Sequence, residues 1–331
     1  MRPGVIGAAL VAALAGLTAT SVGPVGAAVP SAQTGTRAAR HSPGARHGAS
    51  TLRVLLTAAP ATRYLVFVGA TGTGQSYGLY RSVPGTTART TLLAPGGPRG
   101  VTDPPAVDPT GKWIAYSFAD ATGTGVAITS ISGLHTYVVV HRPASEPMVV
   151  APTWSPDGKT LVVERYNDSR SVAVGLAILR PVKGAILKPI KGTSGLTYPK
   201  FLPKSSTALV ARRPKDGATV VVTTAGKVTL VGKYGAVGFA VSPNAKLLAY
   251  TDTTGNLWVR PWRAKGTARK LAHRGLAEFP VFSRNGATIY FDSPASGGLP
   301  TDIFSVNVAG KTLVREQVTP ALEEWGPAVS A

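Results

Sequence analysis

The chain has 331 residues, 44% of them apolar, and its 35 basic against 15 acidic side chains give a formal net charge of +20. This apolar content is ample for a buried core, and 38 Gly and 27 Pro favour strands joined by turns. The absence of cysteine excludes disulfides and lipid-modified cysteines, so stability has to come from packing.

The first residues are typical of an export signal. Arg2 supplies a positive charge, residues 5–17 form an apolar run and residues 25–28 offer small side chains for cleavage. The run is shorter than the ~20 residues of a membrane-spanning helix, so no transmembrane span is expected. The sequence predicts a signal peptide over residues 1–28 and a secreted or cell-envelope location; the alternative is an uncleaved apolar N-terminus. Residues 29–60, basic and without acids, predict a disordered leader.

The next segment, YLVFVGATGTGQSYG from Tyr64, matches two catalytic patterns. Residues 69–76 have phosphate-loop spacing with Gln75 where lysine is needed, and residues 74–78 form G-x-S-x-G, the hydrolase nucleophile elbow. Both patterns need a helix after the loop, but YGLYRSVPG alternates like a strand. None of the five histidines forms a recognisable triad pattern with Ser76. We therefore expect a plain hairpin loop.

No metal site or cofactor is predicted. His135 and His141 point to one face of an expected strand but stand about 20 Å apart at ~3.3 Å per residue, too far to share an ion. No H-E-x-x-H pattern or Asp-rich calcium loop occurs.

One phrase returns five times from residue 103 onward. Its copies are PAVDPTGKWIAYSF (105–118), PTWSPDGKTLVVERY (152–166), PKFLPKSSTALVAR (199–212), GFAVSPNAKLLAYTD (238–252) and PVFSRNGATIYFDS (280–293). In the second copy, Asp157 can hydrogen-bond the backbone of a turn and Gly158 can adopt the left-handed conformation, with a strand on either side. The phrase predicts an inner hairpin, and two further strands complete a four-stranded unit. A period in the forties is typical of propeller blades.

The pattern also reaches back before the first full phrase. Residues 63–94 align with the second, third and fourth strands of a unit, and the missing first strand appears in WGPAVSA, where Val329 lies 47 residues after Phe282. The sequence therefore predicts an all-β, six-bladed β-propeller over residues 61–331, closed by the C-terminal strand pairing into the first blade beside Leu65. A closed ring hides strand edges that would otherwise stay unpaired.

These phrases, above all WSPDGK with a following LVV or LAY and a later LWVRPW, resemble the TolB-like (WD40-like) propeller repeat over about residues 63–331. Similar repeats occur in Tol translocation proteins, in the propeller halves of prolyl-oligopeptidase-type peptidases and in many exported proteins, so the resemblance implies a fold more than an activity. The Tol protein has an α/β domain before its propeller, and the peptidases have a hydrolase domain; neither is expected here. The resemblance implies an isolated propeller that binds something.

Positive charge is concentrated in the expected third and fourth blades, where residues 169–250 carry thirteen basic side chains and one acidic one. The candidate basic patch comprises Lys183, Lys188, Lys191, Lys200, Lys204, Arg212, Arg213 and Lys215. On one side of a ring they could meet an anionic envelope polymer, lipid headgroups at a membrane surface, or an acidic protein. The alternative is a solvated face that keeps the protein soluble. Nucleic acid is not expected as a partner, because export separates the protein from most of it.

The loops that lead into the first strand of each blade should gather around the mouth of the central channel. They carry acidic and aromatic residues, namely Asp103, Glu146, Tyr198, Glu278, Phe279, Glu323, Glu324 and Trp325. Such a mouth could bind a cationic peptide or a small ligand. Ordinary solvation of loops explains the same residues equally well.

The sequence thus favours an exported, non-enzymatic binding or scaffold protein that recognises a protein or an anionic envelope ligand, and we expect a monomer. The alternative is a propeller-class lyase or hydrolase that acts on an envelope polymer at the channel mouth. A cluster of acids with strongly shifted pKa in a deep central pocket would favour the enzyme.

Overall fold

The structure is a computed structural model that describes residues 63–70, 76–86, 91–94, 100–167, 172–263, 266–271, 276–294, 301–317 and 323–330. The predicted signal peptide and leader lie outside these residues, as do residues 71–75 of the loop that matches two catalytic patterns. Within the described part of the chain, no helix is long and apolar enough to span a membrane.

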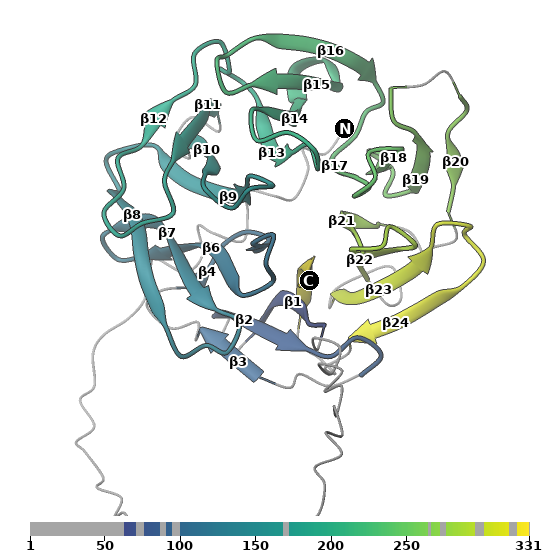
Figure 1. The fold of residues 1–331 in the computed structure, drawn as a ribbon, viewed down its shortest axis with the longest axis horizontal. Helices are drawn as coiled ribbons and strands as arrows, with labels where there is room; N and C mark the ends of the chain where they lie inside the picture. Colours follow the sequence, from purple (N-terminus) through teal and green to yellow (C-terminus); the bar gives the residue numbers. More distant parts are fainter. Residues whose placement is uncertain are drawn as a thin grey trace, which may run out of the picture.

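Six antiparallel sheets surround a common centre, so the predicted all-β, six-bladed propeller is confirmed (Figure 1). Blade 1 contains β25 (Glu324–Val329), β1 (Leu65–Ala70), β2 (Tyr77–Ser82) and β3 (Thr91–Ala94). Blade 2 contains β4 (Gly100–Val101), β5 (Ala106–Val107), β6 (Trp113–Asp120), β7 (Gly123–Ser130) and β8 (Thr136–Pro143). Blade 3 contains β9 (Met148–Trp154), β10 (Leu161–Asn167), β11 (Val172–Leu179) and β12 (Lys188–Pro189).

The remaining three blades repeat the same order of strands from the centre outward. Blade 4 contains β13 (Thr197–Phe201), β14 (Ala208–Arg213), β15 (Ala218–Thr223) and β16 (Val228–Lys233). Blade 5 contains β17 (Gly238–Val241), β18 (Leu247–Thr251), β19 (Leu257–Pro261) and β20 (Arg269–Lys270). Blade 6 contains β21 (Glu278–Phe282), β22 (Thr288–Pro294), β23 (Thr301–Asn307) and β24 (Leu313–Gln317).

The recurring phrase forms the innermost hairpin of each repeat, as predicted. In blade 3, Gly158 has φ 69° and the Asp157 carboxylate accepts the Lys159 N–H at 3.1 Å. The Ser155 hydroxyl also donates to Asp157 at 2.6 Å and accepts the Thr160 N–H at 3.0 Å. These local bonds satisfy the turn's polar groups and fix the register in which β10 leaves.

The core lies between neighbouring blades, because each strand alternates its side chains between the two faces of its sheet. Blades 3 and 4, for example, bury Val162, Leu176, Leu209 and Val220 against one another, each at 0–1% exposure. Every other pair of neighbouring blades shares a similar cluster of described apolar residues. The wedge of side chains between blades therefore holds the ring.

The C-terminal strand closes the ring, which confirms the prediction for blade 1. β25 pairs antiparallel with β1, and Leu65 lies opposite Val329. At one end of this seam the Ser330 N–H donates to the Tyr64 carbonyl at 2.9 Å, while the Tyr64 N–H donates to the Ser330 hydroxyl at 2.7 Å. At the other end the Ala70 N–H donates to the Glu323 carbonyl at 3.0 Å.

Blade 2 departs from the expected four strands, because its first strand is split into β4 and β5, both paired with β6. The break falls at Asp103, Pro104 and Pro105. Proline lacks the N–H that a ladder needs, so two in succession interrupt the pairing.

Candidate functional site at the channel mouth

The innermost strands enclose a central cavity of about 280 Å³. Its walls come from β5, β9, β13, β17, β21 and β25, so every blade contributes (Figure 1). We call the end where the chain enters these strands the upper end, or mouth, and the end at the inner hairpin turns the lower end. Among the described lining residues, Lys200 is the charged one, and proline and apolar side chains form most of the rest.

Four of the innermost strands are bent at the mouth by a residue in the left-handed conformation followed by proline. These residues are Ala151 (φ 50°), Tyr198 (φ 49°), Phe279 (φ 41°) and Gly326 (φ 62°). Each lies where the pairing with the second strand changes register, which marks a β-bulge. The conformation costs an L-residue about 1–2 kcal/mol, and a following proline disfavours it further. Strain of this kind concentrates at functional sites.

The bulges aim aromatic side chains toward one another across the mouth. The rings of Tyr198 and Phe279 lie 5.9 Å apart, and those of Phe279 and Trp325 lie 6.0 Å apart. Tyr77 extends the row, with its ring 6.2 Å from that of Trp325. All four side chains are partly exposed. This mouth aromatic row joins blades 4, 6 and 1, although its members are far apart in the sequence.

Carboxylates from second strands reach the strained backbone of the next blade. Glu164 of β10 accepts the Tyr198 N–H at 2.9 Å, and Asp292 of β22 accepts the Gly326 N–H at 3.4 Å. Burial raises the pKa of Glu164 to about 8, and burial, with repulsion from Glu278, raises the pKa of Asp292 well above its usual range. These two acids therefore link blades while remaining poorly solvated.

A lysine and an aspartate form the other charged part of the mouth. Asp103 accepts hydrogen bonds from the Thr102 hydroxyl at 2.9 Å and the Ser117 hydroxyl at 3.1 Å, and burial raises its pKa. Desolvation lowers the pKa of Lys200 to about 8, and the nearby Asp103 charge partly opposes that shift. Lys200, predicted as part of a surface patch, thus belongs to the channel.

The other predicted mouth acids separate into three environments. Glu278 borders the aromatic row next to Phe279, and burial raises its pKa. Glu323 accepts a hydrogen bond from the Tyr77 hydroxyl, so it also borders the row. Glu324 is fully buried at 0% exposure within β25, and Glu146 is exposed and paired with Arg142 at 3.2 Å beside the outermost strand of blade 2. Glu324 and Glu146 therefore do not form part of an open mouth.

The structure does not gather the eight predicted basic residues into one patch. Lys204 lies in the lower turn before β14, whereas Arg213 and Lys215 lie at the upper end of that strand, about 20 Å away at ~3.3 Å per residue. Arg213 is also paired with Asp216 at 2.8 Å. The remaining members are Arg212 at the upper end of β14, Lys200 in the channel, and Lys183, Lys188 and Lys191 on the outer side of blade 3. Each blade strand runs between the upper and the lower end of the channel. Residues at the two ends of one strand therefore lie on opposite faces of the ring.

Sequence reasoning missed Tyr77, Glu164 and Asp292. A signal for the two acids was present, because each is a charged residue directly after three apolar or aromatic residues of a second strand, LVV before Glu164 and IYF before Asp292. Arg212 occupies the same position of the phrase in LVARR. A charged residue thus recurs at one position of the second strand, next to core residues. This recurrence indicates a layer of charged side chains just behind the mouth.

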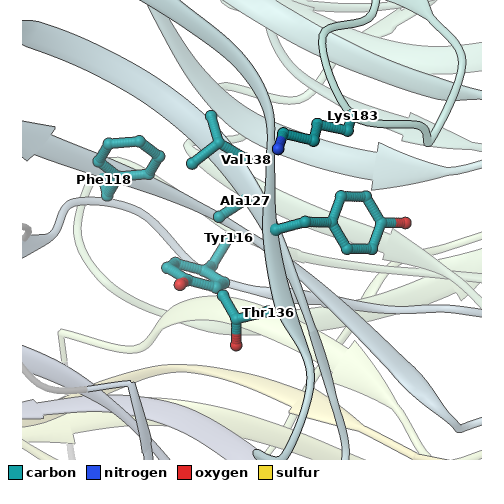
Figure 2. Close-up of a pocket in the computed structure, with 7 residues that line it drawn as sticks. Tyr116, Phe118, Ala127, Thr136, Val138 and Lys183 are labelled. Atoms are coloured by element: carbon teal, nitrogen blue, oxygen red, sulfur yellow. The ribbon is translucent and has the colours of Figure 1, made fainter.

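A second cavity, of about 270 Å³, opens on the outer part of blade 2 (Figure 2). Its described lining residues are Tyr116, Phe118, Ala127, Thr136, Tyr137, Val138 and Lys183. The Tyr137 hydroxyl donates to the Pro181 carbonyl at 2.9 Å, which ties this wall to blade 3.

The described residues contain no group of three His, Asp or Glu side chains placed to hold a metal ion. The loop that matches two catalytic patterns leads into the strand β2, as its alternating sequence predicts.

Comparison with known proteins yields a fold and no family assignment. No protein-family model matches the chain, and no curated protein matches it. TolB from Acinetobacter baumannii is similar with a TM-score of 0.64 and 18% identity, over 81% of this chain and 66% of that one, so this chain spans about two thirds of TolB's length. A chain of a nidogen/laminin complex is similar at 0.63 and 8% identity, over 81% and 98%. An oligogalacturonate lyase in complex with manganese is similar at 0.51 and 16% identity, over 76% and 73%. At these identities the likeness is one of architecture, and the chain is a six-bladed β-propeller similar in fold to TolB.

Proposed function

We propose that this protein is an exported, non-enzymatic binding protein whose channel mouth holds a cationic segment of a partner protein. The observation that carries the proposal is the mouth aromatic row, bordered by the carboxylates of Glu278 and Glu323. Export rests on the apolar run and small residues of the N-terminal sequence.

Partly exposed rings and nearby carboxylates together favour a positively charged group. A lysine or arginine over a ring face within about 6 Å gains about 0.5–2 kcal/mol, most when it is desolvated. The tilts between neighbouring rings of the row are 54° and 43°, so the rings do not stack flat against one another. The carboxylates supply the balancing charge at the edge.

The mouth is also a local exception in a basic molecule. Five acids, Asp103, Glu164, Glu278, Asp292 and Glu323, lie around it against two basic residues, Lys200 and Arg212, whereas the molecule as a whole carries +20. Crowding and burial hold several of these carboxyls toward the protonated form. A bound cation would replace those protons, so binding should release protons to the buffer.

Calorimetric titration with a capped nonapeptide that contains three lysines tests this function, against the same peptide with norleucine at those positions. We expect the lysine peptide alone to bind, with a dissociation constant of about 10–100 µM. Repeating the titration in two buffers of different ionisation enthalpy should reveal proton release.

Two matched variants locate the site. Glu278→Gln should weaken the lysine peptide about fivefold or more, whereas Glu146→Gln removes the same charge away from the mouth and should leave affinity unchanged. Trp325→Leu should also weaken binding. Equal binding of the two peptides, or equal effects of the two glutamine variants, would refute the proposal.

The lyase or hydrolase alternative retains one specific observation in its favour. Lys200, with a pKa of about 8, lines the central cavity. Glu164, whose pKa is also about 8, is bonded to the backbone of Tyr198 at the upper end of that cavity. A partly neutral amine can accept a proton and a protonated carboxyl can donate one, as general acid–base chemistry requires. The bond from the Tyr198 N–H gives Glu164 a structural role as well, which favours binding over catalysis.

Incubation with polygalacturonate separates the two functions. A lyase would produce unsaturated ends that absorb near 235 nm, and a hydrolase would produce reducing ends, in either case lost in Lys200→Met. We expect neither product, and turnover that depends on Lys200 would replace the binding proposal with the enzymatic one.

A further inference from the structure

A basic and apolar loop lies on the outer side of blade 3. The segment 180–191, RPVKGAILKPIK, contains four basic residues and no acidic one. Ile186 and Val182 are 78% and 49% exposed, and Lys183, Lys188 and Lys191 are exposed beside them. Lysine and large apolar side chains therefore share one accessible segment.

The loop is held by the neighbouring blade. The Ala185 N–H donates to the Val139 carbonyl at 2.8 Å, and the Tyr137 hydroxyl donates to the Pro181 carbonyl at 2.9 Å. Both bonds are made by β8, the outermost strand of blade 2. Ala185 and Leu187 pack into the core between the blades, so Ile186 between them is directed outward on an anchored backbone.

The turn that leads into β8 adds a second apolar tip. Leu134 is 80% exposed, and Leu134 and Ile186 are the two most exposed large apolar side chains among the described residues. They lie on the turn before β8 and on the loop bonded to β8. The outer docking patch is defined as Leu134, Val182, Lys183, Ile186 and Lys188.

We infer that the outer docking patch binds the surface of an anionic lipid bilayer. Lysines near such a surface contribute about 1 kcal/mol each, and apolar tips gain about 25 cal/mol per Å² that they bury among the acyl chains. A soluble polyanion would use the lysines but not Leu134, Val182 or Ile186, which is why a lipid surface fits the patch better. Lys183 also lines the second cavity, whose apolar wall of Phe118 and Val138 adjoins this loop (Figure 2).

Vesicle sedimentation of the purified protein tests this inference. The two probes are vesicles of phosphatidylcholine alone and vesicles with about one third phosphatidylglycerol. We expect binding to the anionic vesicles only. Salt should weaken the binding without abolishing it, because the apolar contribution is not screened.

Matched variants separate lipid from polyanion binding. Val182→Ser with Ile186→Ser, and Lys183→Glu with Lys188→Glu, should each reduce binding to the anionic vesicles, the charge reversal by more than about tenfold. Leu230→Ser with Lys227→Glu and Lys233→Glu makes the same kinds of change on β16 and at the residue just before it, where Leu230 is 53% exposed, and should leave binding intact.

Three outcomes would overturn the inference. One is no binding to anionic vesicles by the parent protein. Another is equal loss in the β16 variant, which would show that net charge alone drives adsorption. The third is full retention of binding in the serine variant together with tight binding to soluble polygalacturonate, which would assign the lysines to a polyanion. An unchanged thermal melt confirms that each variant is folded.

Discussion

The two ends of the innermost strands are built differently. At the lower end, the left-handed position of the turn is taken by glycine in three blades, at Gly111, Gly158 and Gly286, and nearby hydroxyl, carboxylate and amide groups are paired locally. At the mouth, Tyr198 and Phe279 take the left-handed conformation, and the carboxylates behind them are desolvated.

This difference separates what folding needs from what the mouth does. A turn that only reverses the chain can use glycine without strain, as the lower end does. At two of its four bulges the mouth keeps a bulky aromatic residue where glycine would be less strained, and both of these residues belong to the mouth aromatic row. Local rules are broken where a site is built.

Removing most of one innermost strand should have the largest effect, because such a strand contributes to both ends of the channel. Deletion of residues 326–331 takes away most of β25 and leaves β1 with an unpaired edge. Each lost backbone bond costs about 0.5–1.5 kcal/mol, and the sum rivals the stability of a whole domain. We expect an insoluble protein or a large drop in melting temperature, measured by circular dichroism. A melt like that of the intact chain would count against a ring held by this strand.

Two glycines at opposite ends offer a matched test. A Cβ on Gly326 would lie 2.9 Å from the Cα of Pro104, whereas on Gly286 its nearest neighbour would be the Pro243 Cδ at 3.6 Å. Both glycines have positive φ, so Gly326→Ala and Gly286→Ala share a backbone cost of about 1–2 kcal/mol. The clash should add about 1–3 kcal/mol to Gly326→Ala alone, measured by urea unfolding. Equal costs would show that the mouth tolerates a side chain there.

The pH dependence of stability tests whether the carboxyl of Glu164 behind the mouth is desolvated. The pKa of Glu164 is raised by burial from 4.5 to about 8, so between these values the unfolded chain has released a proton that the folded one keeps. Stability therefore falls as pH rises through this window, by about 1.4 kcal/mol for each pKa unit at most. Glu164→Gln keeps an acceptor for the Tyr198 N–H but cannot ionise. We expect the variant and the parent to have the same free energy of unfolding near pH 4.5, and the variant to be more stable by a few kcal/mol at pH 8. If the difference in stability between the two proteins did not change with pH, the raised pKa of Glu164 would be contradicted.

The smallest effect comes from the exception at the lower end. Ala245 has φ 59° in the blade 5 turn, where blades 2, 3 and 6 have glycine. Ala245→Gly should stabilise the protein by about 0.5–1 kcal/mol, because relief of strain exceeds the added freedom of the unfolded chain. Differential scanning calorimetry would detect it as a small rise in melting temperature. A decrease would mean that packing of the Ala245 methyl outweighs the strain.

The repeated phrase was enough to predict the fold from the sequence, but it predicted only part of the candidate site. The phrase predicted the turn at Gly158 and the pairing of Leu65 with Val329, because turn chemistry and hydrophobic alternation are local signals that the ring repeats. The packing that brings Tyr77 to Trp325 depends on bulge geometry and on the seam, which alternation does not encode. Glu146 shares a loop class with the mouth residues, yet it is exposed and paired with Arg142 beside the outermost strand of blade 2.

The seam has a consequence for how the molecule can be assembled from separate pieces. Tyr64 and Ser330 are 266 positions apart, and β25 meets the rest of its blade only through non-covalent contacts. A strand with the sequence of β25 could therefore pair with β1 whatever its source. It could come from the same molecule, from a second copy by reciprocal exchange, or from a synthetic peptide. At high concentration the protein should accordingly yield exchanged dimers, and a chain lacking this segment should be rescued by the peptide EWGPAVSA supplied in trans.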